Sequence, residues 1–158
     1  MDKLWAPWRA KYVTKIASHP NKCIFCAMLA EKKDKSNYVF KRSKHSFAVL
    51  NIYPYNNGHV LVLPNRHVKE IKRLKMEEKL DLYALMEDTQ NHLEKVMKPH
   101  GFNIGINVGK FAGAGFPGHL HIHIVPRWRG DVNFMPVVGN TKVISQSLDH
   151  LYKLLSHA

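Results

Sequence analysis

Five short apolar stretches of the chain have the composition or the alternation typical of β-strands. A turn rich in proline, asparagine and glycine, at residues 54–58, separates the second stretch from the third and predicts an antiparallel meander. The fifth stretch follows a glycine-rich loop, residues 109–118, and places histidines between aliphatic residues. The five stretches are residues 38–40, 47–50, 59–63, 102–108 and 119–126.

The spacing of apolar residues such as Leu80 and Tyr83 predicts one long helix over residues 76–98, which Pro99 and Gly101 end. Strands that alternate with helices and have hairpin-like connections predict an α+β fold on an antiparallel sheet of about five strands. The shorter expected helices cover residues 22–31, 67–73 and 145–155.

Length and composition bound the class of protein. The 158 residues suffice for a single domain, and 45% hydrophobic with 23% charged residues is ordinary for a globular protein. No window holds the roughly 18 apolar residues of a membrane-spanning helix, and residues 1–10 lack the apolar core of a secretory signal. With only two cysteines, the sequence favours a cytoplasmic protein without a membrane partner.

The net charge of +12 attracts polyanions, whether nucleotides, polyphosphates or nucleic acid. The lysines are spread along the chain, and aromatic residues do not alternate with basic ones as in a platform for single strands. Charge therefore does not favour a dedicated nucleic-acid partner and leaves small anionic ligands open.

Three histidines fall on one face of the fifth predicted strand, because successive side chains of a strand point to opposite sides. His119, His121 and His123 share that face, while the aliphatic residues between them point to the core. One alternative is a metal site of three histidines, although their spacing of ~6.7 Å along the strand makes this awkward. Another is a structural cluster. The glycine-rich loop, whose backbone amides can approach an anion, favours phosphoryl chemistry, and a flexible linker is its alternative.

Cys23 and Cys26 have the spacing of half a tetrahedral zinc site. A redox pair is a second interpretation, but such pairs follow a strand in a thioredoxin-like order that this chain lacks. Two buried free thiols are a third.

The stretch from His119 to Val125 resembles the signature of the histidine triad (HIT) superfamily. Residues 47–51 and 58–62 are similar to the strands on the nucleoside side of that fold, so the resemblance covers residues 22–135. It implies a single domain over residues 1–158, with an N-terminal extension at 1–21 and a C-terminal extension with a helix at 136–158. Residues 5–9, 112–118 and 126–134 resemble the diadenosine tetraphosphate phosphorylase branch.

The resemblance implies a role for each matching residue. His121 would be the nucleophile that becomes nucleotidylated, His123 would hydrogen-bond the α-phosphate or the bridging oxygen, and His59 would support the triad from behind. Asn51 would contact the ribose and Asn107 the α-phosphate or the leaving group. Phe47, Leu50 and Ile52 are candidates for the base pocket, with core packing as the alternative.

One departure from the family pattern concerns the leaving group. Many members carry Ser, Thr or Gln just before the triad, where this chain has Phe116, Pro117 and Gly118. With Gly115, this stretch is expected to bind substrate, and Trp128 is expected to hold the far part of a dinucleotide.

The zinc-bearing members of the superfamily imply His67 and His119 as the partners of the two cysteines, in a structural site with no open position. The family also implies a homodimer through the long helix and an adjacent strand. The expected function is a hydrolase or phosphorylase that acts at the α-phosphate of a dinucleoside polyphosphate through a nucleotidyl-histidine intermediate. The alternatives are a hydrolase of nucleoside phosphoramidates or acyl nucleotides, and a nucleotide-binding regulatory module.

Overall fold

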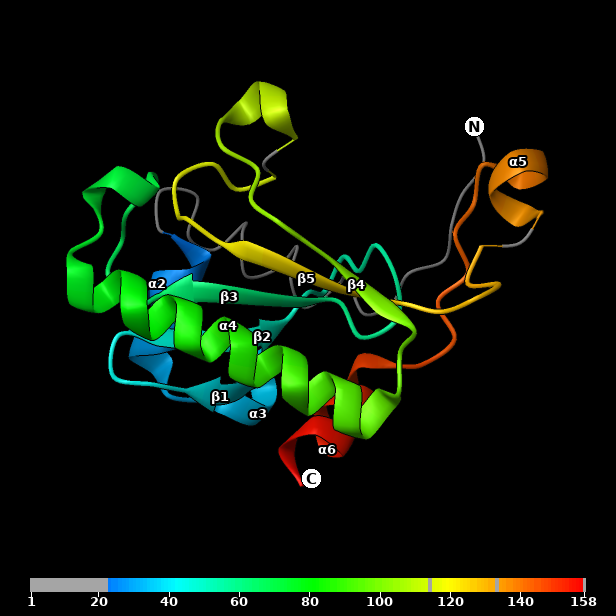
Figure 1. Ribbon diagram of the computed structural model, residues 1–158, viewed down its shortest axis with the longest axis horizontal. Coiled ribbons are helices and arrows are strands. Elements are labelled where there is room, and N and C mark those ends of the chain that lie inside the picture. The colour runs from blue at the N-terminus through cyan, green and yellow to red at the C-terminus, as the bar shows by residue number, and fades with distance from the viewer. Residues whose placement is uncertain (1–22, 114, 133, 158) are drawn as a thin grey trace.

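Five antiparallel strands form one sheet in the order β1-β2-β3-β5-β4 (Figure 1). The computed structural model describes residues 23–113, 115–132 and 134–157. The expected N-terminal extension at residues 1–21, which includes the branch-like residues 5–9, lies outside this part of the chain. The strands are β1 (Val39–Arg42), β2 (Ser46–Leu50), β3 (Val60–Pro64), β4 (Gly101–Gly105) and β5 (Ile122–Arg127).

All five expected strands are present, but two are shorter than the sequence predicts. Strand β4 ends at Gly105, and its partner there is His123 of β5. Strand β5 begins only at Ile122, because the backbone N–H of Leu120 donates to the Val68 carbonyl at 2.6 Å and not to a neighbouring strand. The chain nevertheless continues the alternation into β5, since Leu120 is buried in the same core as Ile122.

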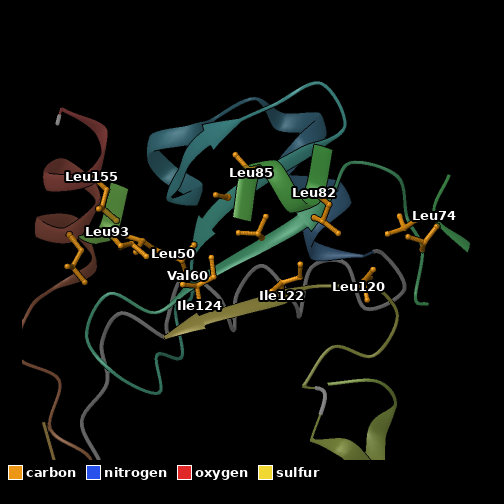
Figure 2. Packing of buried hydrophobic residues seen from close by; sticks show 14 residues of the cluster. Leu50, Val60, Leu74, Leu82, Leu85, Leu93, Leu120, Ile122, Ile124 and Leu155 are labelled. Atoms are coloured by element: carbon orange, nitrogen blue, oxygen red, sulfur yellow. The ribbon is translucent and has the colours of Figure 1, made fainter. Parts of the chain in front are cut away.

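Helix α4 (Met76–Met97) confirms the expected long helix and lies across one face of the sheet (Figure 1). Helix α6 (Leu148–Ser156) confirms the C-terminal helix and contacts both α4 and β1. Leu80 and Tyr83 are each 65% exposed, so the core face of α4 is a different stripe of the helix. Figure 2 shows the cluster on this side of the sheet, which includes Leu50, Val60, Leu82, Leu85, Leu93, Leu120, Ile122, Ile124 and Leu155.

The opposite face of the sheet carries a second, smaller cluster. Helix α2 (Ile24–Glu31) covers part of this face and contributes Phe25, while Phe47, Val49 and Leu61 come from the strands. Because β2 and β3 are buried along their whole length, both faces of the sheet centre are covered.

Shorter elements complete the described chain. The helix expected at residues 67–73 is only a 3-10 turn, η1 (Ile71–Arg73), because the preceding residues make other contacts, such as the Val68 carbonyl with Leu120. No described helix is long and apolar enough to cross a membrane. Three further helical segments were not expected from the sequence: α3 (Asp34–Asn37), η2 (Lys110–Ala112) and α5 (Met135–Gly139).

Candidate functional site

The sheet register brings three histidines to the face that α2 partly covers. Leu61 of β3 is paired with His123 of β5, and His59, two residues before Leu61, lies on the same side. His59, His121 and His123 are 1%, 6% and 8% exposed, respectively. Burial in an apolar setting requires each imidazole to find hydrogen-bond partners, and these partners fix where its proton sits.

His121 has one ring nitrogen fixed and one facing the cavity described below. Its Nδ1 lies 2.8 Å from the backbone carbonyl oxygen of His119. Because a carbonyl oxygen only accepts, Nδ1–H is the donor, and Nε2 of the neutral ring keeps its lone pair. A neutral imidazole with a free lone pair is a nucleophile that needs no base to activate it.

His59 and His123 form a hydrogen-bonded pair of defined direction. The backbone N–H of Tyr55 donates to Nδ1 of His59 at 3.0 Å, so the proton of His59 is on Nε2. That Nε2–H donates to Nδ1 of His123 at 2.9 Å. The proton of His123 is therefore on Nε2, which is buried and has no partner among the described residues. His123 thus has an unused N–H donor on a ring whose centroid is 4.9 Å from that of His121, and both residues line the cavity described below.

Burial keeps His59 and His123 neutral. Desolvation, followed by the charges of His123 and His121, lowers the pKa of His59 from 6.5 to about 3. Desolvation, followed by the charge of His121, lowers the pKa of His123 to about 4. Near neutral pH neither ring is charged, so His123 interacts with an anion as a hydrogen-bond donor and not as a cation.

An apolar cavity of about 210 Å³ opens beside His121 and His123. Leu50 and Ile52 line it, whereas Phe47 belongs to the fully buried core. An apolar cavity that ends in a few convergent polar groups is typical of a small-molecule site. The lining residues that sequence reasoning missed are Ile24, Phe25, Met28, Val49, Tyr53, Tyr55 and Leu61.

A sequence signal existed for part of that lining. Ile24 and Phe25 precede the second cysteine on α2, and Met28 lies about one turn after them, so the expected helix already carried an apolar face. Nothing in the sequence said that this face would turn toward the histidines. Tyr53 and Tyr55 lie in the turn before β3 and gave no periodic signal.

Three of the expected substrate-binding residues line the cavity: Asn51, Gly115 and Phe116. The Asn51 side chain also serves the protein itself, because its Oδ1 accepts from the Tyr53 N–H at 2.9 Å and its Nδ2 lies 3.3 Å from His59 Nδ1. The expected ribose contact of Asn51 remains a prediction.

The other expected substrate-binding residues do not line this cavity. Gly118 approaches the metal-ligating candidate His67, whose Cε1 is 3.9 Å from the position of an added Cβ. Pro117 neighbours Gly118 and is exposed. Asn107 follows β4, and its Nδ2 makes a long contact of 3.5 Å with the Gly113 carbonyl oxygen. The roles expected for these residues remain predictions.

Trp128 lies at the far end of β5, just after Arg127. Its Nε1–H donates to the Lys98 carbonyl oxygen at 3.2 Å. With His100 and Arg129, it lines a separate surface depression. Within one chain, Trp128 is therefore not part of the cavity beside His121.

The two cysteines meet two histidines from distant parts of the chain. The ligand atoms of Cys23, Cys26, His67 and His119 all lie within 4.8 Å of one another. Three of the four sulfur–nitrogen pairs are separated by 3.3, 3.4 and 3.7 Å. A tetrahedral zinc ion with its usual bond lengths would separate sulfur from nitrogen by ~3.6 Å. These four side chains therefore fit zinc.

The second ring nitrogen of His119 supports the same reading. Its Nε2 lies 2.9 Å from the Pro64 carbonyl oxygen, so Nε2–H donates and the Nδ1 lone pair faces the sulfurs. Burial, followed by the hydrogen bond with Cys23, raises the pKa of the Cys26 thiol to about 11. A metal would replace that proton, as thiolate ligation requires.

The fold and the site together define a class: an α+β domain in which a free imidazole lone pair and an imidazole N–H meet at one apolar cavity. The model of the HIT domain family matches residues 32–130. An AP-4-A phosphorylase of Mycobacterium tuberculosis is 38% identical over 162 residues, which cover 99% of this chain and 83% of that protein. The chain belongs to the HIT domain family.

Other comparisons agree with this assignment. An asymmetrical bis(5'-nucleosyl)-tetraphosphatase of Schizosaccharomyces pombe is 43% identical over 93 residues, 59% of this chain and 50% of that protein. Among solved structures, a Zn-bound histidine triad family protein from Mycobacterium smegmatis shares the fold, with a TM-score of 0.68 and 24% identity. That match covers 85% of this chain and 91% of the other.

Proposed function

We propose that this protein cleaves a dinucleoside polyphosphate at the α-phosphate, with His121 as the nucleophile. The observation that carries the proposal is the pairing at one cavity of the His121 Nε2 lone pair with the His123 Nε2–H donor. The relatives named AP-4-A phosphorylase and bis(5'-nucleosyl)-tetraphosphatase support this substrate class.

In the first step, Nε2 of His121 attacks the α-phosphorus. A nitrogen–phosphorus bond forms, and the bond from phosphorus to the bridging oxygen of the leaving polyphosphate breaks. The Nε2–H of His123 is placed to donate a hydrogen bond to that region. In the second step, an oxygen of inorganic phosphate or water bonds to the same phosphorus, the nitrogen–phosphorus bond breaks, and His121 regains its lone pair. When water is the acceptor, its proton passes to solvent.

Substrate recognition divides between the cavity and the surface charge. Ile24, Phe25 and Met28 of α2 offer an apolar wall for a nucleobase, and Asn51 lies at the same cavity for the ribose. The net charge of +12 favours the approach of a polyphosphate. Asn107, Pro117 and Gly118 are proposed to contact the phosphates from the loop that leads to the histidines.

We further propose that the four-residue cluster binds a structural zinc ion. Cys23 and Cys26 flank the first turn of α2, and His119 precedes the nucleophile by two residues, so the cluster fastens the cavity wall to the segment that carries His121. The His119 carbonyl is also the acceptor that fixes the His121 ring. Thiolate ligands suit a reducing compartment, and we propose the cytoplasm as the location.

Exposed apolar residues support a homodimer. Leu80 and Tyr83 on α4 are exposed, as is Ile104 on β4, which is an edge strand of the sheet. If two copies pair along β4, antiparallel strands bring the Gly101 end of one copy toward the Gly105 end of the other. Trp128 of the partner would then lie near the loop that leads to His121, which fits its expected role with the far part of a dinucleotide.

Sedimentation velocity of the wild type and of Leu80→Lys tests this dimer, and a monomeric wild type would refute it.

A substrate panel with the purified protein tests the function. With phosphate as acceptor, a phosphorylase should release ADP and ATP from diadenosine tetraphosphate, whereas a hydrolase that uses water should release AMP and ATP. Mass spectrometry after acid-free quenching should find a nucleotide on His121. Turnover that survives His121→Ala would refute the mechanism.

The same panel separates the two alternatives. Rapid AMP release from adenosine 5'-phosphoramidate, without cleavage of diadenosine tetraphosphate, would favour the phosphoramidate hydrolase. Tight binding of nucleotides without turnover would favour a regulatory module.

A further inference from the structure

Tyr55 contacts both members of the His59–His123 pair with its ring. The ring centroids of Tyr55 and His59 are 4.6 Å apart, and those of Tyr55 and His123 are 5.4 Å apart with only 13° between the planes. The Tyr55 backbone N–H is the donor to His59 Nδ1. One residue therefore binds the first imidazole through its main chain and stacks on the second through its side chain.

We propose that Tyr55 is a positioning residue that holds the His59–His123 pair in the one tautomer able to donate a hydrogen bond to the substrate. This inference rests on the proposed function, because it assigns the purpose of the His123 N–H to the cleaved phosphate.

The hydrogen bond between the two rings could run in either direction. In the opposite direction, His123 would donate from Nδ1 to His59 Nε2, and His123 Nε2 would carry a lone pair toward the cavity. Two lone pairs, of His121 and His123, would then face an anionic phosphate, and no imidazole donor would remain there. The direction of this single bond thus decides whether the cavity can stabilise developing negative charge.

The Tyr55 N–H excludes that opposite direction. A His59 ring that accepted at Nε2 would carry its proton on Nδ1, which lies 3.0 Å from the Tyr55 nitrogen. Two N–H donors would then point at each other, and both would lose a partner in a buried setting. Asn51 Nδ2, a second donor 3.3 Å from the same Nδ1, adds to this bias.

The Tyr55 ring keeps the N–H in place. The residue lies in the turn between β2 and β3, outside regular secondary structure, where strand pairing does not restrain the backbone. Stacking on His123 and a tilted ring contact with His59 hold that turn against the pair. The side chain remains 55% exposed, so its truncation removes the stack without opening a cavity in the core.

The test compares Tyr55→Ala with Tyr55→Phe, which keeps the flat ring. For Tyr55→Ala we expect kcat to fall by ~10- to 100-fold, the range typical of residues that orient a reacting group, with KM within about 3-fold of wild type. For Tyr55→Phe we expect kcat within about 2-fold of wild type. Met28→Ala is the matched control at the same cavity, and it should raise KM more than it lowers kcat. If Tyr55→Ala fails to fold, Tyr55→Leu keeps apolar bulk without the flat ring.

A second readout does not need turnover. Long-range proton–nitrogen correlation spectra of the histidine rings should show His123 protonated at Nε2 in the wild type and in Tyr55→Phe, and a mixture of tautomers in Tyr55→Ala. A single unchanged tautomer in Tyr55→Ala would overturn the inference, and so would a mixed tautomer with wild-type kcat. A higher KM with unchanged kcat would instead make Tyr55 a surface that stacks on the substrate. If the wild type cleaved no dinucleoside polyphosphate, the proposed function would fail while the tautomer result still decided the positioning of His123.

Discussion

The two faces of the sheet are built from alternate residues of the same strands, yet one is packed with aliphatic side chains and the other carries hydrogen-bonded histidines. On the α4 face, residues such as Leu50, Val60 and Ile124 pack against aliphatic side chains of the helix (Figure 2). On the α2 face, His59 and His123 occupy comparable buried positions beside Leu61. The first face contributes stability through apolar burial, which is insensitive to direction. On the second face, each ring nitrogen depends on one specific partner, which makes this face suited to chemistry.

The largest effect should come from the α2 face. We expect His121→Ala to lower turnover by at least about 1000-fold, because removal of a nucleophile leaves only binding and electrostatic contributions. The thermal midpoint should stay close to that of the wild type. His150→Ala, which changes an exposed histidine of α6, is the control and should retain full turnover.

Loss of the proposed zinc ion should have the next largest effect, which we expect on stability. A ligand that binds only the folded state adds to the free energy of unfolding, and structural zinc commonly adds several kcal/mol. We expect one zinc per wild-type chain by elemental analysis, little in Cys23→Ser, and a clearly lower thermal midpoint in that variant. A wild type purified without metal, and unaffected by added zinc, would refute the site.

The α4 face should show the reverse pattern. Leu93 is fully buried against the sheet, and Leu93→Ala should lower the free energy of unfolding by about 2–5 kcal/mol through lost burial and a residual cavity. At a temperature where the variant is folded, its kcat should match that of the wild type. Urea unfolding and steady-state kinetics measure the two quantities. A large loss of kcat in the folded variant would contradict the assignment of stability to the α4 face and catalysis to the α2 face.

The smallest effect should be a pH dependence that belongs to the α2 face alone. The folded-state pKa of His59 is about 3, below its usual 6.5, so between these values the unfolded chain binds a proton at His59 and the folded chain does not. The free energy of unfolding is therefore highest above pH 6.5 and decreases as the pH falls toward 3. At pH 5.5, His59 should lower the free energy of unfolding by on the order of 1 kcal/mol. Urea unfolding at pH 7 and 5.5 should show this loss in the wild type and in Leu93→Ala, and a smaller one in His59→Asn.

The sequence predicted each face but not which groups meet on it. Alternation placed His121 and His123 opposite Ile122 and Ile124, and the structure bears this out although β5 begins only after His121. The expected zinc ligands were assembled from family resemblance, and the folded chain brings all four together. The exposed Leu80 and Tyr83 show the limit of periodicity, since a helix with several apolar stripes does not reveal which stripe faces the sheet.

The features predicted from the sequence are local: five strand patterns, one long helix, three histidines at alternate positions and two cysteines at zinc spacing. These follow from the fixed repeat of helix and strand, which a single stretch of chain expresses on its own. Long-range packing brings His59 to His123, makes α2 a wall of the cavity, and stacks the Tyr55 ring on His123. Such contacts join residues far apart in the chain, such as Cys23 and His119, which are 96 positions apart, and they depend on strand order and register. The proton positions depend on the same contacts, because a histidine tautomer is set by the partner that each ring nitrogen finds.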